Sequence, residues 1–375
     1  MKIVFTGGGT GGHILPIIAI VRELKSTYKD TDLELFYMGP EDKFGDVLLS
    51  QEGVQTFNVP AGKLRRYWGF AAFFQNLADL FIWIPLGIAK ALKVLFFISP
   101  DLIFSKGGYG AIPATVAGRL FLRIPVFLHE SDIVPGKANL AAQRFALEVF
   151  TSFPQTRNFP PKKVLLVGNP IRTRLLSGSV QEAHQLFQLV GGKPVLLILG
   201  GSQGAKRVND MLLSVLNDAL SQFEIIHQTG YANFKEAEEE AAVAAAEENL
   251  PYYHPIPFLN ENEIRHAYAA ADFIVSRAGS GTIFEIAALG KPSILVPLPE
   301  SAQNHQVENA YAYAQTGAAL VLEEPNVKPH FFLERIRNII FAQEEMAHMS
   351  KAALQFAKPE AARIIANYIL AYLVR

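Results

Sequence analysis

Glycine-rich turns that follow short apolar runs are the feature of this sequence most able to do chemistry. The first, Thr6 to His13, joins the run Ile3–Thr6 to a segment of helical apolar spacing. Pro16 fits the first turn of that helix, where a missing N–H is no loss. A strand, a glycine turn and a helix N-terminus bring free N–H groups and a positive dipole to one point. The turn is therefore predicted to bind an anion or another closely approaching polar ligand.

The same arrangement recurs along the chain. Gly200 to Lys206 follows the run Val195–Leu199 and contains Ser202, whose hydroxyl could donate to a phosphate. Ser105 to Gly110 follows the run Leu102–Phe104. A single loop of this kind is often only a tight turn. Several of them at the carboxyl ends of predicted parallel strands, in both halves of the chain, predict ligands in a cleft between two domains.

The first turn also matches a dinucleotide-binding pattern, because Gly7, Gly9 and Gly12 satisfy G-x-G-x-x-G. This match alone is weak. A NAD site would need an acidic residue at the end of the second strand. That strand ends with Tyr37 to Pro40, and Glu34 lies inside it. A NAD-dependent oxidoreductase is therefore the weaker interpretation.

Two later segments suit a sugar nucleotide. Ser276 to Glu285 follows a strand, and the Glu285 carboxylate could accept two hydrogen bonds from a ribose diol. Pro297 to Ala310 is rich in Asn and Gln, which both donate and accept and so suit sugar hydroxyls. The plainer alternatives are a Glu that favours the helix dipole and a capped helix with a solvated face.

The elements that must position these residues follow an α/β pattern. Short apolar runs alternate with helical segments along the whole chain, which predicts parallel sheets in two Rossmann-like domains. The expected strands are Ile3–Thr6, Leu33–Met38, Val54–Val59, Leu102–Phe104, Val126–His129, Val164–Val167, Val195–Leu199, Glu224–His227, Phe273–Val275, Ile294–Pro297 and Ala319–Leu322. The break between the two series is expected near Gly168-Asn169-Pro170, because a residue before proline leaves the helical region.

Two helices are expected outside these series. Phe234–Asn249 is rich in Ala and Glu and is predicted to be a solvated helix. Pro359–Val374 is predicted to pack on a domain face. Its apolar residues at helical spacing are Ile365, Tyr368, Ile369 and Tyr372.

Composition excludes several classes of protein. The chain has 375 residues, of which 50% are hydrophobic and 18% charged, so it can bury two sizeable cores. A formal net charge of -1 supplies no global basic field for nucleic acid. The absence of cysteine excludes disulfides, Cys-ligated metals and thiol nucleophiles. The mean hydropathy of +0.18 is high for a soluble protein, so part of the apolar surface must be accounted for beyond two ordinary cores.

Two segments bear on membrane contact. Leu77–Ile98 is apolar, but charged residues and a proline interrupt it, which argues against a spanning helix. The interrupting residues are Asp79, Pro85, Lys90 and Lys93. Lys63 to Phe74 mixes basic and aromatic residues as interfacial segments do, although Trp68, Phe70 and Phe73 could instead be core. The start of the chain does not read as a secretory signal, so a cytoplasmic location is expected.

Taken together, the motifs resemble the MurG family, the undecaprenyl-diphospho-muramoylpentapeptide N-acetylglucosaminyltransferases of peptidoglycan synthesis. The resemblance extends from Met1 to about Leu322. The matching residues are Gly8 to His13 with Pro16, Gly107 to Tyr109, His129-Glu130, Pro135-Gly136 with Ala138-Asn139, Gly168 to Arg172, Gly200 to Ala205 with Asn209, Arg277 with Gly279, and Glu285 to Ala287.

The resemblance implies a GT-B fold, in which two Rossmann-like domains with parallel sheets face across a cleft. An N-terminal acceptor and membrane-associated domain would comprise residues 1–168 and a C-terminal UDP-GlcNAc-binding domain residues 169–356. A C-terminal helix within 357–375 would pack back on the first domain.

The family's activity implies an inverting transfer of GlcNAc from UDP-GlcNAc to the C4 hydroxyl of MurNAc in undecaprenyl-diphospho-MurNAc-pentapeptide (lipid I), which forms lipid II. It implies a peripheral enzyme on the cytoplasmic face of the plasma or inner membrane, acting in cell wall biogenesis, cell shape and cell division. Neither a cofactor nor a nucleic-acid partner is expected. The alternatives are a GT-B glycolipid synthase acting on diacylglycerol, a UDP-sugar epimerase and a non-catalytic sugar-nucleotide-binding subunit.

The resemblance also implies roles for individual residues. The donor would be bound by Thr10, Gly11, Gly12, Arg172, Ser202, Gln203, Gly204, Phe258, Arg277, Glu285, Gln306 and Asn309. Gly107, Gly108, Tyr109 and Asn139 would lie on the acceptor side, with His13, Glu130 and Thr10 beside the lipid I diphosphate. Ser202 and Arg172 would hold the donor diphosphate and Glu285 the ribose. Gln306 would hold a GlcNAc hydroxyl, and the Phe258 backbone would lie beside the uracil.

Inversion requires a base for the acceptor hydroxyl and stabilisation of the departing UDP. His13 is the preferred base, because a helix N-terminus disfavours imidazolium. Glu130 is the main alternative, and His13 could instead only cap its loop. Helix N-termini and Arg172 could stabilise the leaving charge without a metal. Asp30-Thr31-Asp32 matches a metal motif in letters but precedes a strand in an expected surface turn, so no metal site is predicted.

Some positions depart from the family pattern. Ser131-Asp132 follows His129-Glu130 where many relatives have Gln-Asn, which leaves the role of Asp132 open. Ser280-Gly281 stands where Ala-Leu is frequent, and His305 where some relatives have Gln.

Overall fold

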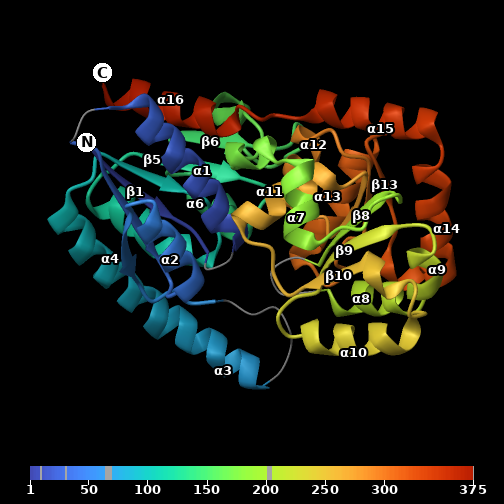
Figure 1. The fold of residues 1–375 in the computed structure, drawn as a ribbon. Coiled ribbons are helices and arrows are strands. Elements are labelled where there is room, and N and C mark those ends of the chain that lie inside the picture. Colours follow the sequence, from blue (N-terminus) through green and yellow to red (C-terminus); the bar gives the residue numbers. More distant parts are fainter. Residues whose placement is uncertain (9–10, 30–31, 64–69, 201–204, 375) are drawn as a thin grey trace. The chain divides into compact units, whose positions relative to one another are not determined.

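The computed structural model describes residues 1–8, 11–29, 32–63, 70–200 and 205–374, with the side chains of 70–73 left aside. The chain divides into two compact units, each built on one parallel sheet (Figure 1). Unit 1 comprises Met1–Arg172 and Lys358–Arg375, and unit 2 comprises Thr173–Ala357. The predicted α/β fold with two Rossmann-like units is confirmed.

The sheet of unit 1 has seven strands in the order β3-β2-β1-β4-β5-β6-β7. They are β1 (Lys2–Thr6), β2 (Glu34–Gly39), β3 (Gln55–Asn58), β4 (Leu102–Ser105), β5 (Val126–Glu130), β6 (Glu148–Thr151) and β7 (Val164–Leu166). In the parallel register, Val4 of β1 lies opposite Phe36 of β2 on one side and Ile103 of β4 on the other. The central strands are almost wholly apolar because helices cover both faces of the sheet.

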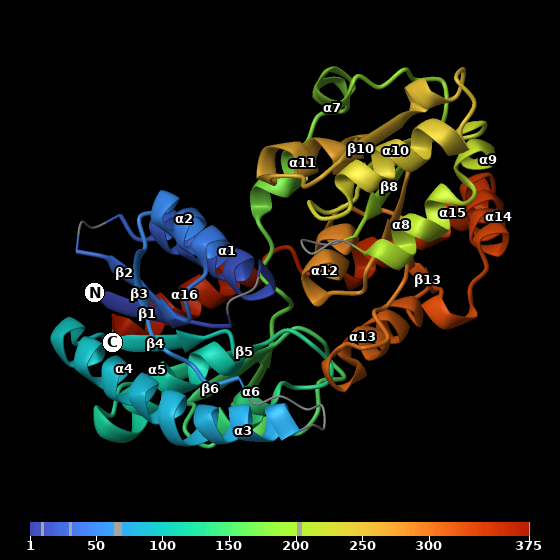
Figure 2. The same cartoon turned by 90° about the horizontal axis from the view of Figure 1, so that it is seen from below.

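Helices cover the two faces of this sheet (Figure 2). On one face lie α1 (Gly11–Thr27), α2 (Lys43–Gln51) and α16 (Ala361–Leu373). On the other lie α4 (Ile84–Ile98), α5 (Ile112–Val116) and α6 (Lys137–Ala142). The remaining helical segments are α3 (Phe70–Ala78), the π-helical η1 (Asp79–Trp83) and η3 (Ala117–Phe121), and the short η2 (Tyr109–Ala111) and η4 (Pro161–Lys163).

One detail of α1 differs from the prediction. The helix begins at Gly11, so Pro16 lies in its second turn rather than its first. A proline there cannot donate to the carbonyl of Gly12, four residues earlier. The carbonyl of Gly12 therefore lacks the usual helical hydrogen bond from the residue four positions later.

The C-terminal helix α16 packs on unit 1. Ile365 and Ile369 are fully buried in the same cluster as Ile17 and Val21 of α1. The Tyr368 hydroxyl donates to Glu148 Oε1 at 2.8 Å. The last helix of the chain thus completes the core of the unit that contains the first strand.

The sheet of unit 2 has six strands in the order β10-β9-β8-β11-β12-β13. They are β8 (Val195–Leu199), β9 (Glu224–Gln228), β10 (Tyr253–Ile256), β11 (Phe273–Ser276), β12 (Ser293–Leu295) and β13 (Ala319–Val321). Every strand expected from the sequence is present at closely matching bounds, and β6 and β10 are added to them.

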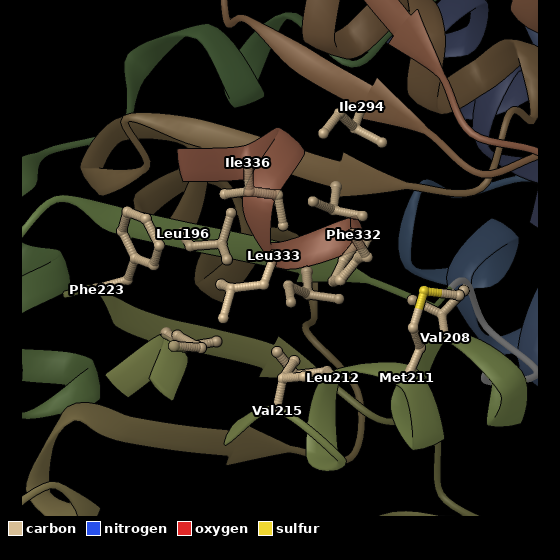
Figure 3. Packing of buried hydrophobic residues seen from close by; sticks show 14 of the residues in the cluster. Leu196, Val208, Met211, Leu212, Val215, Phe223, Ile294, Phe332, Leu333 and Ile336 are labelled. Atoms are coloured by element: carbon tan, nitrogen blue, oxygen red, sulfur yellow. The ribbon is translucent and has the colours of Figure 1, made fainter. Parts of the chain in front are cut away.

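The helical segments of unit 2 again form two layers. They are η5 (Thr173–Ser177), α7 (Val180–Phe187), α8 (Lys206–Leu213), α9 (Leu216–Leu220), α10 (Phe234–Ala244), η6 (Leu250–Tyr252), α11 (Glu261–Ala270), α12 (Ser280–Ala288), η7 (Ala302–Asn304), α13 (His305–Ala314), η8 (Glu324–Asn326), α14 (Pro329–Ile340) and α15 (Gln343–Phe356). Figure 3 shows Phe332 and Ile336 of α14 packed among the same residues as Leu196 of β8 and Leu212 of α8. The expected solvated helix at Phe234 is α10, which ends earlier than predicted and buries only Ala237 and Ala241.

The segment Phe74–Ile98 is a continuous helical run of 25 residues, formed by the end of α3, η1 and α4. By length and composition it could cross a membrane, which the interrupting residues had argued against. Core helices of soluble proteins also pass this test, but only 22% of the most apolar window of this run is buried. The apolar surface implied by the high mean hydropathy therefore lies in part on this helix.

Candidate functional site

The glycine turns lie at the points where each sheet reverses its strand order. The order reverses between β1 and β4 in unit 1 and between β8 and β11 in unit 2. Open parallel sheets bind ligands outside the carboxyl ends of their strands at such points. The turns after β1 and β4 and those after β8 and β11 are thus the positions where each unit can receive a ligand.

In unit 1, two glycine turns close around the imidazole of His13, in the first turn of α1. A Cβ on Gly8 would lie 3.0 Å from His13 Cε1, and a Cβ on Gly108 would lie 3.0 Å from His13 Nε2. Gly107 and Gly108 also have φ values of +83° and +78°, which side-chain-bearing residues rarely adopt. Only glycine therefore lets the turn after β4 approach the ring this closely.

The surroundings of His13 favour its neutral form. Desolvation and, secondarily, the nearby Lys106 ammonium lower the pKa of His13 to about 4, while Asp132 opposes the shift. The imidazole is consequently uncharged at neutral pH and able to accept a proton.

Glu130, at the end of β5, is buried and heavily hydrogen-bonded. Its Oε1 accepts from the Asp132 amide at 3.1 Å, and its Oε2 accepts from the Gly136 amide at 3.0 Å and from Asn139 Nδ2 at 2.9 Å. Burial, and secondarily the Asp132 charge, raise the pKa of Glu130 to about 6 against the effect of these bonds. The carboxylate holds the loop between β5 and α6 in place.

Asn139 and Tyr109 border the same turn. Asn139 Nδ2 also donates to the His129 carbonyl at 3.1 Å, and a Cβ on Gly107 would come within 2.6 Å of this nitrogen. Tyr109 begins η2, and Lys63 Nζ lies 5.9 Å from the centre of its ring. The residues expected on the acceptor side thus lie together at the carboxyl ends of the strands of unit 1. They are His13, Gly107, Gly108, Tyr109 and Asn139.

In unit 2, Arg277 is held within the protein. Its Nη1 donates to Glu324 Oε2 at 2.8 Å and to the Val296 carbonyl at 3.1 Å, and Nη2 donates to Glu324 Oε1 at 3.4 Å. Glu324 is 8% exposed, so the pair is largely removed from water. A two-point Arg–carboxylate contact fixes the guanidinium plane. Arg277 thereby ties β11 to the segments that follow β12 and β13.

Glu285 lies in α12, where it is nearly buried. The Tyr268 hydroxyl of α11 donates to Glu285 Oε2 at 3.1 Å. The bond orients the carboxylate, and neither Tyr268 nor its position was recognised in the sequence.

The amide-rich segment before α13 has an unusual backbone. Gln303 and Asn304 have φ values of +58° and +56°, in the left-handed region. Such residues cost on the order of 1 kcal/mol each and are typical of ligand-binding sites. Gln306 Oε1 accepts from the Leu298 amide at 3.0 Å, and Asn309 is fully buried.

An aromatic pair lies beside β9 and β10. Tyr231 and Phe258 stack with ring centroids 6.0 Å apart, and Tyr231 is 73% exposed. The amide of Leu259 donates to Gln228 Oε1 at 3.2 Å, and Gly200, which follows β8, donates its amide to the Gln228 carbonyl at 3.3 Å. Gln228 therefore links the glycine turn to the segment that contains Phe258.

Comparison with known proteins identifies the family. The chain is 32% identical over 390 residues to the UDP-N-acetylglucosamine–N-acetylmuramyl-(pentapeptide) pyrophosphoryl-undecaprenol N-acetylglucosamine transferase of Treponema denticola, covering 99% of this chain and 97% of the relative. The chain belongs to this transferase family. A Clostridium botulinum protein of the same name is 34% identical over 371 residues, covering 98% of this chain and 99% of that protein.

Family models and solved structures agree with this membership. Residues 3–151 match the glycosyltransferase family 28 N-terminal domain and residues 195–365 its C-terminal domain. The crystal structure of Acinetobacter baumannii MurG superposes with a TM-score of 0.72 at 25% identity, covering 99% of both chains. A UDP-GlcNAc 2-epimerase from Neisseria meningitidis has a TM-score of 0.67 at 16% identity over 99% of this chain and all of that one, which shows the shared GT-B fold alone.

Within this MurG-family chain the expected site residues fall on both units. Gly11, Gly12 and Arg172 belong to unit 1, and Phe258, Arg277, Glu285, Gln306 and Asn309 belong to unit 2. Thr10, Ser202, Gln203 and Gly204 lie outside the described residues, as do Asp30, Thr31 and Trp68. Across the described part of the chain, no group of three or more His, Asp or Glu side chains is placed to hold a metal ion.

Two of the positions that depart from the family pattern lie where helices begin. Ser280 begins α12 directly after its N-cap, Gly279. His305 Nδ1 lies 2.7 Å from the Ala302 carbonyl, to which it donates, so the ring closes the turn before α13.

Several residues of these sites were not recognised in the sequence. They are Lys106, Gln228, Tyr268 and Glu324. Lys106 had one usable signal, since it stands between an apolar strand and two glycines. The others act through partners distant in the sequence, which no local pattern indicates.

Proposed function

We propose that this chain transfers N-acetylglucosamine from UDP-N-acetylglucosamine to the C4 hydroxyl of MurNAc in lipid I, with inversion, and so forms lipid II. The observation that carries the proposal is 32% and 34% sequence identity, over nearly the whole chain, to transferases whose names state this donor and acceptor. Glycine turns at the reversal point of each sheet add a physical reason, because a transfer reaction needs a donor site and an acceptor site.

The donor is assigned chiefly to unit 2. The Glu285 carboxylate, oriented by Tyr268, suits a ribose diol, and the Gln306 amide suits a GlcNAc hydroxyl, with the buried Asn309 nearby on the same helix. The Phe258–Tyr231 pair offers an aromatic surface for the uracil. The diphosphate is assigned to Ser202 and its neighbours, to Arg172, and to the N-terminus of α8, whose N–H groups and dipole favour an anion.

The acceptor is assigned to the glycine turns of unit 1, with His13 as the base. Its ring is neutral at neutral pH and its Nε2 lies against Gly108. Both carboxylate oxygens of Glu130 already accept N–H bonds, which favours an orienting role for that residue. His13 would take the proton of the C4 hydroxyl as the oxygen attacks the anomeric carbon and UDP departs.

The direct test is an incubation with labelled UDP-GlcNAc and lipid I, followed by a search for labelled lipid II. Parallel reactions with diacylglycerol, with no acceptor and with NAD separate the alternatives. Transfer to diacylglycerol alone would favour a glycolipid synthase, and conversion of UDP-GlcNAc without an acceptor would favour an epimerase. Binding of UDP-GlcNAc with no product in any reaction would favour a non-catalytic subunit.

The chain is further assigned to the cytoplasmic face of the plasma membrane as a peripheral protein, because its acceptor is a lipid. Large apolar side chains are exposed along η1, α4 and η3, the last of which packs against α4. They include Leu80, Phe81, Ile82, Trp83, Leu86, Phe96, Phe97, Leu120 and Phe121. Lys90 and Lys93 are exposed on the same helix and could meet anionic lipid headgroups. Flotation with liposomes measures this attachment.

A further inference from the structure

A buried lysine lies at the acceptor side and has no role in the reaction described above. Lys106 directly follows β4, and only 3% of its surface is exposed. Its backbone amide donates to the Thr6 carbonyl at 2.8 Å, at the carboxyl end of β1. Burial lowers its pKa to about 8, opposed by the charges of Glu130 and Asp132, so the ammonium form prevails at neutral pH.

The ammonium group joins segments that are far apart in the sequence. Nζ lies 2.8 Å from His129 Nδ1 in β5 and 3.4 Å from Asn169 Oδ1 in the segment after β7, and it also donates to Ser131 Oγ. An ammonium has three N–H donors and no acceptor. These three partners therefore use its whole donor capacity.

This arrangement determines the tautomer of His129. Because the ammonium can only donate, His129 Nδ1 must accept, and Nε2–H must donate to the Gly168 carbonyl at 3.1 Å. Burial, together with the Lys106 charge, holds the pKa of His129 well below its usual range, in keeping with a neutral ring. Lys106 thus fixes Gly168 and Asn169, shortly before Arg172, where the first segment of unit 1 ends.

The same charge lies near His13. A Cβ on Gly7 would be 3.1 Å from His13 Cβ and 3.6 Å from Lys106 Cβ, so both side chains begin beside one glycine. The charged groups that act on His13 are Lys106 after β4 and Asp132 after β5, with opposite signs. The negative charge of Asp132 is thus matched by the buried positive charge of Lys106.

We propose that Lys106 is a positioning residue of the acceptor side, whose ammonium fixes the ends of β4, β5 and the segment after β7 and, balanced by Asp132, supplies a positive charge beside His13. The proposal rests on the proposed function, in which His13 is the base. In this arrangement Ser131 is a partner of the ammonium, and Asp132 is its counter-charge.

A double-variant cycle followed through the pH dependence of kcat tests the charge. Replacing Lys106 by Met keeps the stem and removes the charge, so the pKa of His13 rises and the acidic limb of the profile moves up by about one pH unit. Asp132→Asn moves this limb down, and the double variant returns it toward that of the unaltered enzyme. A merely structural role would lower kcat without this reciprocal movement. Coincident acidic limbs in all four proteins would overturn the proposal.

A second measurement needs neither turnover nor a folded Lys106 variant. The 15N shifts of the His129 ring in the unaltered protein should show the Nε2–H tautomer at pH 7 and change as Lys106 loses its proton near pH 8. An Nδ1–H tautomer at pH 7 would contradict the proposal. If the unaltered protein forms no lipid II, the proposed function fails, while the ring shifts still decide whether Lys106 holds His129.

Discussion

At the scale of single residues, the acceptor side shifts the pKa values of two titratable residues in opposite directions. His13 is desolvated between glycine turns and has its pKa lowered to about 4, whereas Glu130 is buried, faces Asp132 and has its pKa raised to about 6. The two residues therefore differ in their ability to act as a base. The neutral imidazole can accept a proton, while the Glu130 oxygens are committed to a loop.

Replacing His13 by Ala should lower kcat by about 10²- to 10⁴-fold with little change in the KM for UDP-GlcNAc, because only the base is removed. Steady-state kinetics with lipid I measure both constants. Glu130→Gln is the matched comparison, in which an amide NH₂ replaces one acceptor and faces N–H donors. This variant should lose about 1–3 kcal/mol of stability, seen in denaturant unfolding. Near-native turnover of the Ala variant would remove His13 as the base.

Replacing Glu285 by Ala should weaken UDP binding by about 10- to 100-fold, the effect of losing charge-assisted hydrogen bonds to a ribose diol. Isothermal titration calorimetry gives the Kd directly. Tyr268→Phe serves as the control, since it removes only the orienting bond to Glu285 and should weaken binding less. Equal affinity in the Ala variant and the unaltered protein would exclude Glu285 from the donor site.

At the scale of elements, α4 has one buried face and one exposed apolar face. Gly87, Ala91, Leu95 and Ile98 form its buried face, whereas Leu86, Phe96 and Phe97 are exposed. A Cβ on Gly87 would lie 2.0 Å from the Pro60 carbonyl oxygen, so the helix packs directly on the chain beyond β3. The buried face holds the helix in unit 1 and leaves the apolar outer face exposed.

The two faces predict opposite results for two substitutions in α4. Leu95→Ala should cost about 2–5 kcal/mol of stability, because this side chain is wholly buried. Phe97→Ser, at a side chain 74% exposed, should change stability by less than about 0.5 kcal/mol and yet reduce flotation with anionic liposomes. Chemical denaturation and flotation are measured on both variants. Val243→Ser, exposed on α10 of unit 2, is the matched control and should float like the unaltered protein.

The elements also show what the sequence could predict. Parallel strands follow from local apolar runs, so they were found at closely matching bounds. The position of Pro16 and the π-helical η1 and η3 were missed, because helix starts and internal bulges depend on packing. Residue partnerships were missed for a related reason. Arg277 meets Glu324 and Lys106 meets Asn169 only once each sheet has assembled, because these partners follow strands that are distant in the sequence.

At the scale of the whole molecule, the chain forms two units with separate cores, and its last helix belongs to the first unit. Unit 1 can complete its core only when α16, which follows all of unit 2 in the sequence, has packed on it. Two units with their own cores are expected to unfold in more than one step. Each step then reports on one unit.

Calorimetry can use these steps to locate the donor. Ile369→Ala removes a wholly buried side chain of α16 and should lower one transition by the equivalent of about 2–5 kcal/mol, which assigns that transition to unit 1. UDP at a hundredfold excess over its Kd should stabilise the unit that binds it by about 2.7 kcal/mol. Because Glu285, Gln306 and Asn309 all belong to unit 2, the larger shift should appear in the transition that Ile369→Ala leaves unchanged. A shift confined to the transition of unit 1 would place the nucleotide at the glycine turns around His13 and reverse the assignment of donor and acceptor.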